Sequence, residues 1–305
     1  MSDQTREIEF IAVRKCRRPR DTEFQQQQLH GWTPNFQASH ISNLFLGSSA
    51  LFLLVTILTF SIQRGVINMT LDYTHCKDYN GSECSETIFS IAATTQCKCK
   101  VIFNLENAYQ APVYFYYQLD NYYQNHRKFL SSRDDVQLNG KVLSKLDSDC
   151  EPVRYLKSQL NFNKYAPCGL VANALFNDTF QLHLNIDNKS VPVPWSNKNI
   201  AWKSDKTVVF GVPDSWANTV KPPNWNLTAL QRNAGAYAGD EELIVWMKPA
   251  PLPTVKKLHR VIQTSTHPFE KGLPKGIYTL SIKYGNNLLW QLITRITVEI
   301  FNFIC

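Results

Sequence analysis

The chain has 305 residues, of which 44% are hydrophobic and 12% aromatic, so it is long enough to bury a core and is not an intrinsically disordered protein. Its formal charge of +7 is spread thinly apart from a basic run between Arg14 and Arg20. This argues against a nucleic-acid-binding surface, which needs clustered Lys and Arg. The low count of 12 glycines argues against a fold built on Gly-rich phosphate loops.

Residues 41–62 predict a transmembrane helix. The run holds no charged side chain, and at about 1.5 Å rise per residue it is about 33 Å long, enough to cross a hydrocarbon core. A cleaved signal peptide would lie nearer the N-terminus and would have a shorter apolar region. We therefore expect residues 1–40 on one side of a membrane and residues 63–305 on the other.

The two flanks of this helix predict its orientation. Five N-glycosylation tripeptides follow the helix and none precedes it. Their acceptors are Asn68, Asn80, Asn177, Asn188 and Asn226. The segment before the helix is basic, which is typical of a cytoplasmic tail. These features predict a single-pass type II protein with a cytoplasmic N-terminus and a luminal or extracellular ectodomain.

Apart from the terminal Cys305, six of the eight cysteines lie after the helix, and an even number in an extracytoplasmic region indicates a disulfide framework. They are Cys76, Cys84, Cys97, Cys99, Cys150 and Cys168. Zinc is the rival interpretation, but its ligands are normally separated by two to four residues and an oxidising compartment disfavours free thiolates. We expect no metal site. Because Cys97 and Cys99 face the same side of a strand, each should pair with a different earlier cysteine.

The ectodomain pattern is mostly β. Apolar and polar residues alternate in 97–105, 180–186 and 278–284, which predicts antiparallel strands with one buried face. Helical spacing occurs from Asp120 to Leu130, with His126 on the apolar stripe, and again in 255–262. Segments 187–198 and 212–226 are predicted loops. The expected fold class is therefore one mainly antiparallel β domain of all-β or α+β type, with short helices.

Residues 121–140 collect a histidine, basic side chains and two adjacent aspartates, yet no nucleophile, zinc-protease or P-loop motif occurs in the chain. We favour a structural role for this stretch. A type II glycosyltransferase shares the predicted topology, and Asp147-Ser-Asp149 matches the metal-binding Asp-x-Asp pair of such enzymes. The alternating strands do not resemble the parallel α/β core that a nucleotide site usually needs.

Six segments carry a specific family resemblance: "RRPRDTEFQQQQLHGWTP" (17–34), "PVYFYYQLDNYYQNHRKFLSSRDDVQLNG" (112–140), "APCGLVANALFND" (166–178), "IAWKSDK" (200–206), "EELIVWMKPAPLPTVKKLHRVI" (241–262) and "LPKGIYTLSIKY" (273–284). In this order they closely resemble the accessory β-subunits of type-four P-type ATPases, the phospholipid flippases. The resemblance implies a non-catalytic subunit without a cofactor that forms a heterodimer with the ATPase catalytic subunit in a lipid membrane. It implies a role in folding, endoplasmic-reticulum exit and phospholipid translocation, in membranes from the endoplasmic reticulum through the Golgi to the plasma membrane.

The resemblance also implies particular sites. The disulfides would be Cys76–Cys99, Cys84–Cys97 and Cys150–Cys168, and Asn177 matches a family glycosylation position. The cytoplasmic segment before the helix would lie against the ATPase. Its contact residues would be Arg18, Pro19, Phe24, Gln26, Gln27, Leu29, Trp32 and Pro34.

The C-terminal region differs from the family pattern. Family members continue past the position of Tyr284 into a second membrane helix, whereas residues 285–305 carry Arg295 and Glu299 within a hydrophobic run. An Arg or Asp at the bilayer centre costs about 2.5 to 3.5 kcal/mol on insertion scales, so we expect this run not to span a membrane but to form a terminal strand or an interfacial segment. A truncated paralogue or isoform with impaired or competitive ATPase binding is the alternative function.

Overall fold

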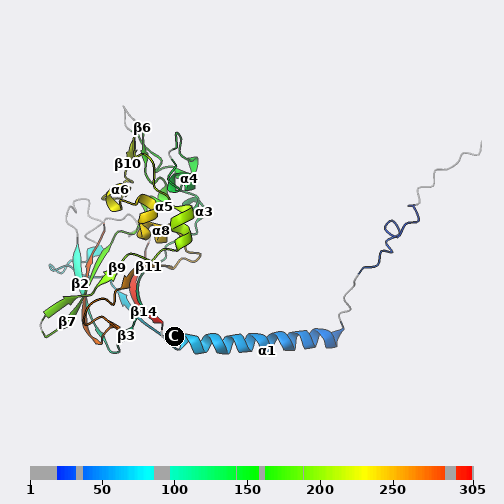
Figure 1. Cartoon of the computed structure of the whole chain (residues 1–305), viewed down its shortest axis with the longest axis horizontal. Helices are drawn as coiled ribbons and strands as arrows, with labels where there is room; N and C mark the ends of the chain where they lie inside the picture. The colour runs from blue at the N-terminus through cyan, green and yellow to red at the C-terminus, as the bar shows by residue number, and fades with distance from the viewer. Residues whose placement is uncertain are drawn as a thin grey trace, which may run out of the picture. The chain divides into compact units, whose positions relative to one another are not determined.

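The computed structural model describes residues 19–31, 37–85, 97–141, 143–157, 162–187, 189–285 and 293–303, and Figure 1 traces them. The chain divides into two units, residues 1–59 and 60–305. Some residues singled out in the sequence lie outside the described ranges. They are Arg18, Trp32, Pro34 and Asn188.

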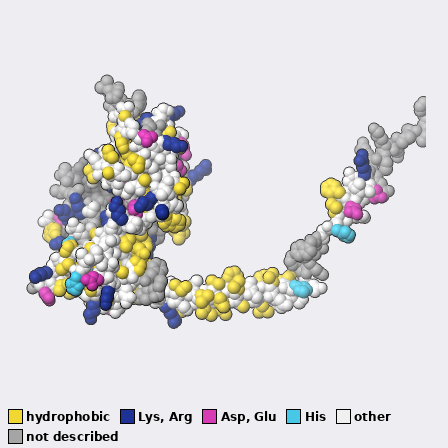
Figure 2. Space-filling model, in the orientation of Figure 1, with side chains coloured by type: hydrophobic (Ala, Val, Ile, Leu, Met, Phe, Trp, Pro, Cys, Tyr) yellow, Lys and Arg dark blue, Asp and Glu magenta, His cyan; other side chains and the backbone are white. Residues whose placement is uncertain are grey.

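Helix α1 (Ala38–Gln63) extends the helix expected over 41–62 by a few residues at its start and by one at its end. None of its side chains is buried, and Figure 2 shows apolar side chains around it. The hydroxyls of Thr56 and Thr59 donate to the carbonyls of Phe52 and Val55 at 2.8 and 2.9 Å, so these polar groups are satisfied within the helix. Among the described residues, α1 is the one helix long and apolar enough to cross a membrane, which fits a single-pass membrane protein.

The larger of two principal sheets has five strands in the order β1-β14-β4-β11-β9. Every neighbouring pair in it is antiparallel. Its strands are β1 (Val66–Asp72), β4 (Val113–Asp120), β9 (Trp195–Ser196), β11 (Val255–Ile262) and β14 (Arg295–Phe303). The sheet thus joins segments from both ends of residues 60–305, the unit that we name the ectodomain after the topology that the sequence predicts.

The second principal sheet has four antiparallel strands in the order β2-β13-β7-β8. They are β2 (Lys98–Leu105), β7 (Thr179–Ile186), β8 (Lys189–Pro192) and β13 (Gly276–Lys283). The strands predicted over 97–105, 180–186 and 278–284 are β2, β7 and β13, so this part of the prediction is confirmed. Their alternating burial is the physical basis of the two-residue period.

Aromatic rings join the two sheets. The ring centroids of Phe115 on β4 and Phe180 on β7 are 5.3 Å apart with an edge-to-face arrangement. The ring of Tyr117, also on β4, stacks at 3.9 Å on Phe176, which precedes β7. Tyr73, just after β1, meets Phe180 edge-on at 5.8 Å. These contacts bury the inner faces of both sheets in one core.

Smaller elements complete the ectodomain, and Figure 1 shows most of the short helices gathered with β6 and β10. Two small sheets have the orders β10-β6-β5 and β12-β3, and β10 pairs with β6 in parallel. Their strands are β3 (Tyr109–Gln110), β5 (Tyr155–Lys157), β6 (Phe162–Tyr165), β10 (Thr219–Val220) and β12 (Gly272–Leu273). The helices are α3 (Arg127–Leu130), α4 (Asp135–Leu138), α5 (Leu170–Asn173), α6 (Ala229–Arg232), α7 (Ala236–Gly239) and α8 (Glu241–Met247), with a 3-10 turn η1 (Ser148–Cys150) and a π turn η2 (Asp205–Val209).

The helix predicted over 255–262 is wrong, because this segment is strand β11. Its buried positions include Lys257, which the hydrophobic pattern did not count. A register shift between Leu258 and Arg260 then moves the buried position that follows His259 to Ile262. The buried lysine and the bulge together leave apolar residues at a spacing that imitates a helix.

The helix predicted from Asp120 to Leu130 is also largely wrong. Strand β4 runs through Asp120, Asn121 adopts a left-handed φ of 65°, and only α3 is helical. His126 is exposed and precedes α3, so it does not lie on a buried stripe. The predicted loops are only partly loops, because β8 and β9 lie within 187–198 and β10 lies within 212–226.

The C-terminal run forms β14, the terminal strand that was one of the two expected outcomes. It lies between β1 and β4, with Val298 and Ile300 buried. Its two charged side chains are paired, since Arg295 Nε is 2.7 Å from Asp72 Oδ2 and Glu299 contacts the ammonium group of Lys256. The charges that disfavour a membrane span are therefore each paired with an opposite charge from another strand, Asp72 of β1 and Lys256 of β11.

We predict that Ile300→Ala destabilises the ectodomain strongly. The side chain is 1% exposed in a strand bonded on both sides, and truncating a buried isoleucine costs about 2 to 5 kcal/mol. Ile277→Ala is the matched control, because Ile277 is 51% exposed on β13. Thermal unfolding of both variants would show the difference, and equal midpoints would contradict the placement of β14 in the core.

Candidate functional site

The tail segment 19–31 forms a local turn. Gln26 Nε2 donates to the carbonyl of Arg20 at 3.2 Å, and the backbone N–H of Gln28 donates to Glu23. Of the expected partner contacts, the structure describes Pro19, Phe24, Gln26, Gln27 and Leu29. Phe24 is 76% exposed and Leu29 58% exposed. Two exposed apolar side chains on a short ordered turn are suited to insertion into another protein's surface.

Two nested disulfides hold the segment after β1 against β2. Cys76 bonds to Cys99 and Cys84 to Cys97, with Cα–Cα distances of 6.0 and 5.5 Å. Cys97 and Cys99 are both buried, while Lys98 between them is exposed. Because Cys97 and Cys99 lie on the same side of the strand, both of their sulfur atoms point toward the earlier cysteines. These are the pairs that the family resemblance implies.

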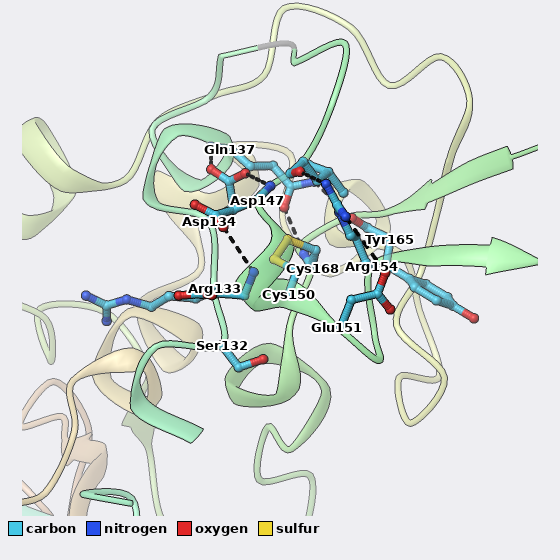
Figure 3. Close-up of a disulfide and its surroundings, with 12 residues drawn as sticks. Ser132, Arg133, Asp134, Gln137, Asp147, Cys150, Glu151, Arg154, Tyr165 and Cys168 are labelled. Atoms are coloured by element: carbon cyan, nitrogen blue, oxygen red, sulfur yellow. Dashed lines mark hydrogen bonds and ion pairs between the residues drawn. A yellow bond between two sulfur atoms is a disulfide. The ribbon is translucent and has the colours of Figure 1, made fainter. Parts of the chain in front are cut away.

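The third disulfide joins Cys150 to Cys168, with a Cα–Cα distance of 5.6 Å, and Figure 3 shows its surroundings. The side-chain amide of Gln137 bridges two backbone groups of the segment that ends at Cys168: its Nε2 donates to the carbonyl of Tyr165 at 2.9 Å, and its Oε1 accepts from the N–H of Cys168 at 2.8 Å. Gln137 is 7% exposed. A buried amide with both ends bonded fixes the position of the disulfide relative to α4.

The aspartates of this region act as helix caps. Asp134 accepts hydrogen bonds from the N–H groups of Val136, Gln137 and Asp147. Asp147 in turn accepts from the N–H of Asp149 at 3.0 Å and caps η1. In the Asp-x-Asp pair that suggested a glycosyltransferase, the carboxylate of Asp147 therefore has a local structural use. No group of three metal-ligating side chains occurs within the described ranges.

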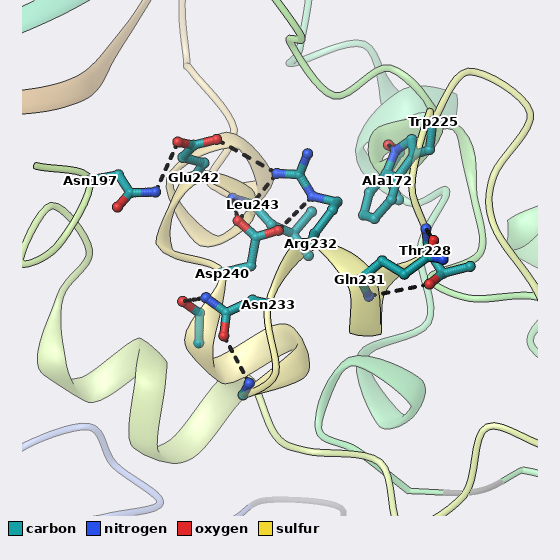
Figure 4. A network of polar contacts seen from close by, with 12 residues as sticks. Ala172, Asn197, Trp225, Thr228, Gln231, Arg232, Asn233, Asp240, Glu242 and Leu243 are labelled. Carbon is teal, nitrogen blue, oxygen red and sulfur yellow. Dashed lines mark hydrogen bonds and ion pairs between the residues drawn. The ribbon is translucent and has the colours of Figure 1, made fainter.

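An ion-pair network joins α6, α8 and the larger sheet, and Figure 4 shows the part of it around Arg232, Asp240 and Glu242. Arg232 on α6 contacts Asp240 at 2.7 Å and Glu242 at 3.6 Å. Glu242 also contacts Arg260 on β11 at 2.6 Å and accepts from the amide of Asn197 at 3.1 Å. Shared carboxylates of this kind cost less ordering entropy for each contact than separate surface pairs.

Two buried tryptophans fix α5. The indole N–H of Trp246 donates to the carbonyl of Val171 at 2.8 Å, and that of Trp225 donates to Ala172 at 2.7 Å. Gly169, which precedes α5, has a φ of +97°, and a Cβ there would lie 2.0 Å from the carbonyl oxygen of Ser132. Only glycine fits this close approach of two backbone segments.

A buried carboxylate joins three segments at the sheet interface. Asp178 is 3% exposed; it accepts a hydrogen bond from the hydroxyl of Tyr73 at 3.1 Å and one from the N–H of Gly285 at 2.8 Å. The hydroxyl of Tyr284 donates to the carbonyl of Tyr73. Burial raises the pKa of Asp178 to about 7, although the two hydrogen bonds oppose this shift.

His259 on β11 is enclosed by four aromatic rings at centroid distances of 5.3 to 6.4 Å. They belong to Phe115, Tyr117, Phe176 and Phe180. Burial lowers the pKa of His259 well below its ordinary value, and the charge of Arg260 adds to this effect. A neutral imidazole among rings is a packing element of the sheet interface.

The structure describes four of the five expected glycan acceptors, and these four lie on different parts of the fold. Asn68, Asn80 and Asn226 are exposed, and Asn177 is half-buried. Asn177 and Asn226, far apart in the sequence, line one cavity of about 170 Å³ together with Trp225 and Arg232. The structure therefore brings two of the five acceptors together, while the tail contacts belong to the other unit.

Several residues that organise this ectodomain were not singled out from the sequence, among them Gln137, Asp178 and Arg232. Asp178 is the middle residue of a glycosylation tripeptide, which draws attention to its neighbours instead. Gln137 and Arg232 are polar residues that have other polar residues nearby in the sequence, so nothing marks them as buried or paired. Their partners are distant in the chain, so no local spacing signals them.

Comparisons with known proteins place the chain among relatives. A sequence model of the LEM3 (ligand-effect modulator 3) family, also named the CDC50 family, matches residues 59–288. Cell cycle control protein 50A from Mus musculus is 35% identical, covering 89% of this chain and 76% of that protein. Cell cycle control protein 50B from Homo sapiens is 33% identical, covering 90% and 81%. The phospholipid-transporting ATPase accessory subunit CRF1 from Saccharomyces cerevisiae is 30% identical, covering 89% and 73%.

We predict that Gly169→Ala destabilises the chain more than Gly81→Ala. Both glycines have a left-handed φ, of +97° and +81°, but nothing lies within 4 Å of a Cβ at Gly81. Gly81→Ala should therefore cost only the conformational penalty of about 1 to 2 kcal/mol. Gly169→Ala must in addition displace the backbone of Ser132. Thermal unfolding compares the two, and a similar loss in both variants would argue against the crowding at Gly169.

We predict that the ectodomain loses stability as pH rises toward 7 and that Asp178→Asn removes this loss. Because the pKa of Asp178 is raised from 3.8 to about 7 in the folded protein, the folded state holds a proton that the unfolded state releases. The free energy of unfolding then falls by up to about 1.4 kcal/mol for each pH unit between these values.

The measurement is the free energy of unfolding of wild type and Asp178→Asn at pH 5.5 and 7.5. The amide of an asparagine can still accept from the N–H of Gly285 and donate to the hydroxyl oxygen of Tyr73. The glycosylation tripeptide beginning at Asn177 stays intact. The variant should gain stability relative to wild type at the higher pH. Parallel pH profiles of the two proteins would show that the Asp178 carboxyl does not titrate in this range.

Proposed function

Because the chain belongs to the LEM3/CDC50 family, we propose that it is a non-catalytic accessory subunit of a phospholipid-transporting ATPase of the type-four P-type class. The observation that carries this proposal is the match over 89% of the chain to a yeast protein named as such a subunit. The chain would form a heterodimer with the ATPase catalytic subunit and would assist its folding, its exit from the endoplasmic reticulum and its transport cycle.

The proposed topology has a cytoplasmic tail over residues 1–40, a membrane span over 41–62 and a luminal or extracellular ectodomain over 63–305. The length and apolar surface of α1 support the span. The three disulfides support an oxidising compartment for the ectodomain. Exposure of Asn68, Asn80 and Asn226 is compatible with glycans at these positions, and we propose Asn177 and Asn188 as further acceptors.

The geometry supports a scaffold rather than a moving part. Three disulfides, the network around Arg232 and the aromatic interface between the sheets all restrict relative motion within residues 60–305. An accessory subunit that stabilises its partner needs such a preorganised surface, because ordering that surface on binding would reduce affinity. The tail would contribute a second contact through Arg18, Pro19, Phe24, Gln26, Gln27, Leu29, Trp32 and Pro34.

The test is to co-express the full chain with individual type-four ATPases. We expect co-purification with at least one ATPase and acquisition of endoglycosidase-resistant glycans by this chain only when that ATPase is present. Immature glycans and no association with any type-four ATPase would count against the proposal and would favour the alternative of a paralogue or isoform that does not hold an ATPase productively.

We predict that the double variant Phe24→Ala, Leu29→Ala reduces ATPase co-purification by about tenfold, because removing two apolar contacts of this exposed turn costs about 1.4 kcal/mol or more. Gln28→Ala is the control, since Gln28 is an exposed polar residue of the same segment. The measurement is the ratio of ATPase to accessory chain after affinity purification. An unchanged ratio for the double variant would remove the tail from the interface.

A further inference from the structure

The outer face of the four-stranded sheet is basic. Its residues form cross-strand rows on β2, β13 and β7, of which the first is Lys98, Lys283 and Thr179 and the second is Lys100, Ser281 and Gln181. The next rows continue with Ile102, Thr279 and His183, then Asn104, Ile277 and Asn185. These rows contain three lysines and no carboxylate. The opposite face of the same strands is the buried core.

The lysines are placed where a sheet normally avoids them. Lys98 lies directly opposite Lys283 in the antiparallel ladder, and Lys100 is the diagonal neighbour of Lys283. Side chains at directly opposed positions start only about 4.5 to 5.5 Å apart, so like charges there are destabilising. A local arrangement that costs stability without an evident compensating contact is expected at a functional site.

No carboxylate neutralises these ammonium groups within the described ranges. The lysines that do form ion pairs there are Lys206, Lys248 and Lys256, in other parts of the ectodomain. Lys100 lies 5.5 Å from the ring centroid of Tyr79, a contact that leaves its positive charge in place.

Lys98, Lys100 and Lys283 all line one cavity of about 370 Å³. The other polar side chains at its wall that can donate hydrogen bonds are Tyr79, Thr179, Gln181 and Ser281. The site is built on a rigid sheet, because β2 is anchored behind Lys98 and Lys100 by the Cys76–Cys99 and Cys84–Cys97 disulfides. Convergent cations and neutral donors on a rigid frame match an oxyanion.

We propose that this lysine cavity binds a phosphate monoester. Such a group carries a charge of about −1.5 to −2 at pH 7 and presents three strong acceptor oxygens. One group can therefore accept from three ammonium donors and offset most of their repulsion, whereas a phosphodiester has one charge and two free oxygens. The monoester can belong to a soluble phosphorylated compound or to a phosphatidic-acid headgroup. The inference goes beyond the proposed ATPase partnership and does not rest on it.

The test measures binding of inorganic phosphate to the full chain in a neutral detergent by calorimetry, at constant ionic strength because surface charges are screened by salt. The site variant is the triple change Lys98→Gln, Lys100→Gln, Lys283→Gln. The matched control, Lys128→Gln, Lys203→Gln, Lys275→Gln, removes the same charge from exposed lysines elsewhere. We expect saturable binding that is at least tenfold weaker in the site variant and within twofold of wild type in the control.

Equal weakening in the site variant and the control would assign any binding to net charge and would overturn the proposal, as would the absence of saturable binding to wild type. Removing opposed charges should also raise the midpoint of thermal unfolding of the site variant without phosphate. If the triple variant does not fold, Lys283→Gln and Lys283→Arg replace it: the first must weaken binding and the second must retain it.

Competition against inorganic phosphate distinguishes a soluble phosphate monoester from a lipid headgroup as the ligand. Glucose 6-phosphate represents a soluble monoester, dihexanoylphosphatidic acid represents a lipid monoester, and dihexanoylphosphatidylcholine is the diester control. Tighter binding of one monoester identifies the source. Failure of both monoesters to compete, or equal competition by the diester, would overturn the monoester assignment.

Discussion

Face-to-face packing of two antiparallel sheets through aromatic rings is the contact on which the rest of the ectodomain depends. Phe115 and Tyr117 on β4 meet Phe180 on β7 and Phe176 just before it, so each sheet provides the other with its buried face. Once both inner faces are covered, the outer faces are free to carry charge. The lysine rows of β2 and β13 are possible only because the alternate residues of the same strands are anchored in this core.

Polar contacts then attach the short helices, which are too short to be stable alone. Their ends are satisfied by specific side chains: Asp134 caps α4, Asp240 caps α8, and the two indoles donate to carbonyls of α5. The same residues connect distant segments, since Asp134 also binds Asp147 and Asp240 also binds Arg232. One side chain thus both caps a helix and links distant segments, which gives Asp134 and Asp240 a structural role.

Sequence patterns were reliable where burial alternates without interruption, as in β2, β7 and β13. They failed in 255–262, where a buried lysine and a bulge produce apolar residues at helical spacing, and near His126, where a positive φ at Asn121 ends the strand before a helix of one turn. The disulfide pairs followed from the family resemblance, and strand geometry alone required only that Cys97 and Cys99 have different partners. The contacts of Gln137, Asp178 and Arg232 could not be predicted, because each joins residues that are remote in the chain.

By itself, the sequence determined the apolar helix, the β character of the ectodomain and the family, because these depend on composition, local periodicity and motifs of consecutive residues. The tertiary structure decided which strands are neighbours, and therefore which side chains meet. Segment 295–303 is hydrophobic in the sequence, but its position in the sheet decides that Arg295 pairs with Asp72 of β1 and that Glu299 reaches Lys256 of β11. Lys98 and Lys283 likewise become a like-charged pair only through the register of two strands distant in the chain. Pairing register is a long-range property, and local periodicity holds no information about it.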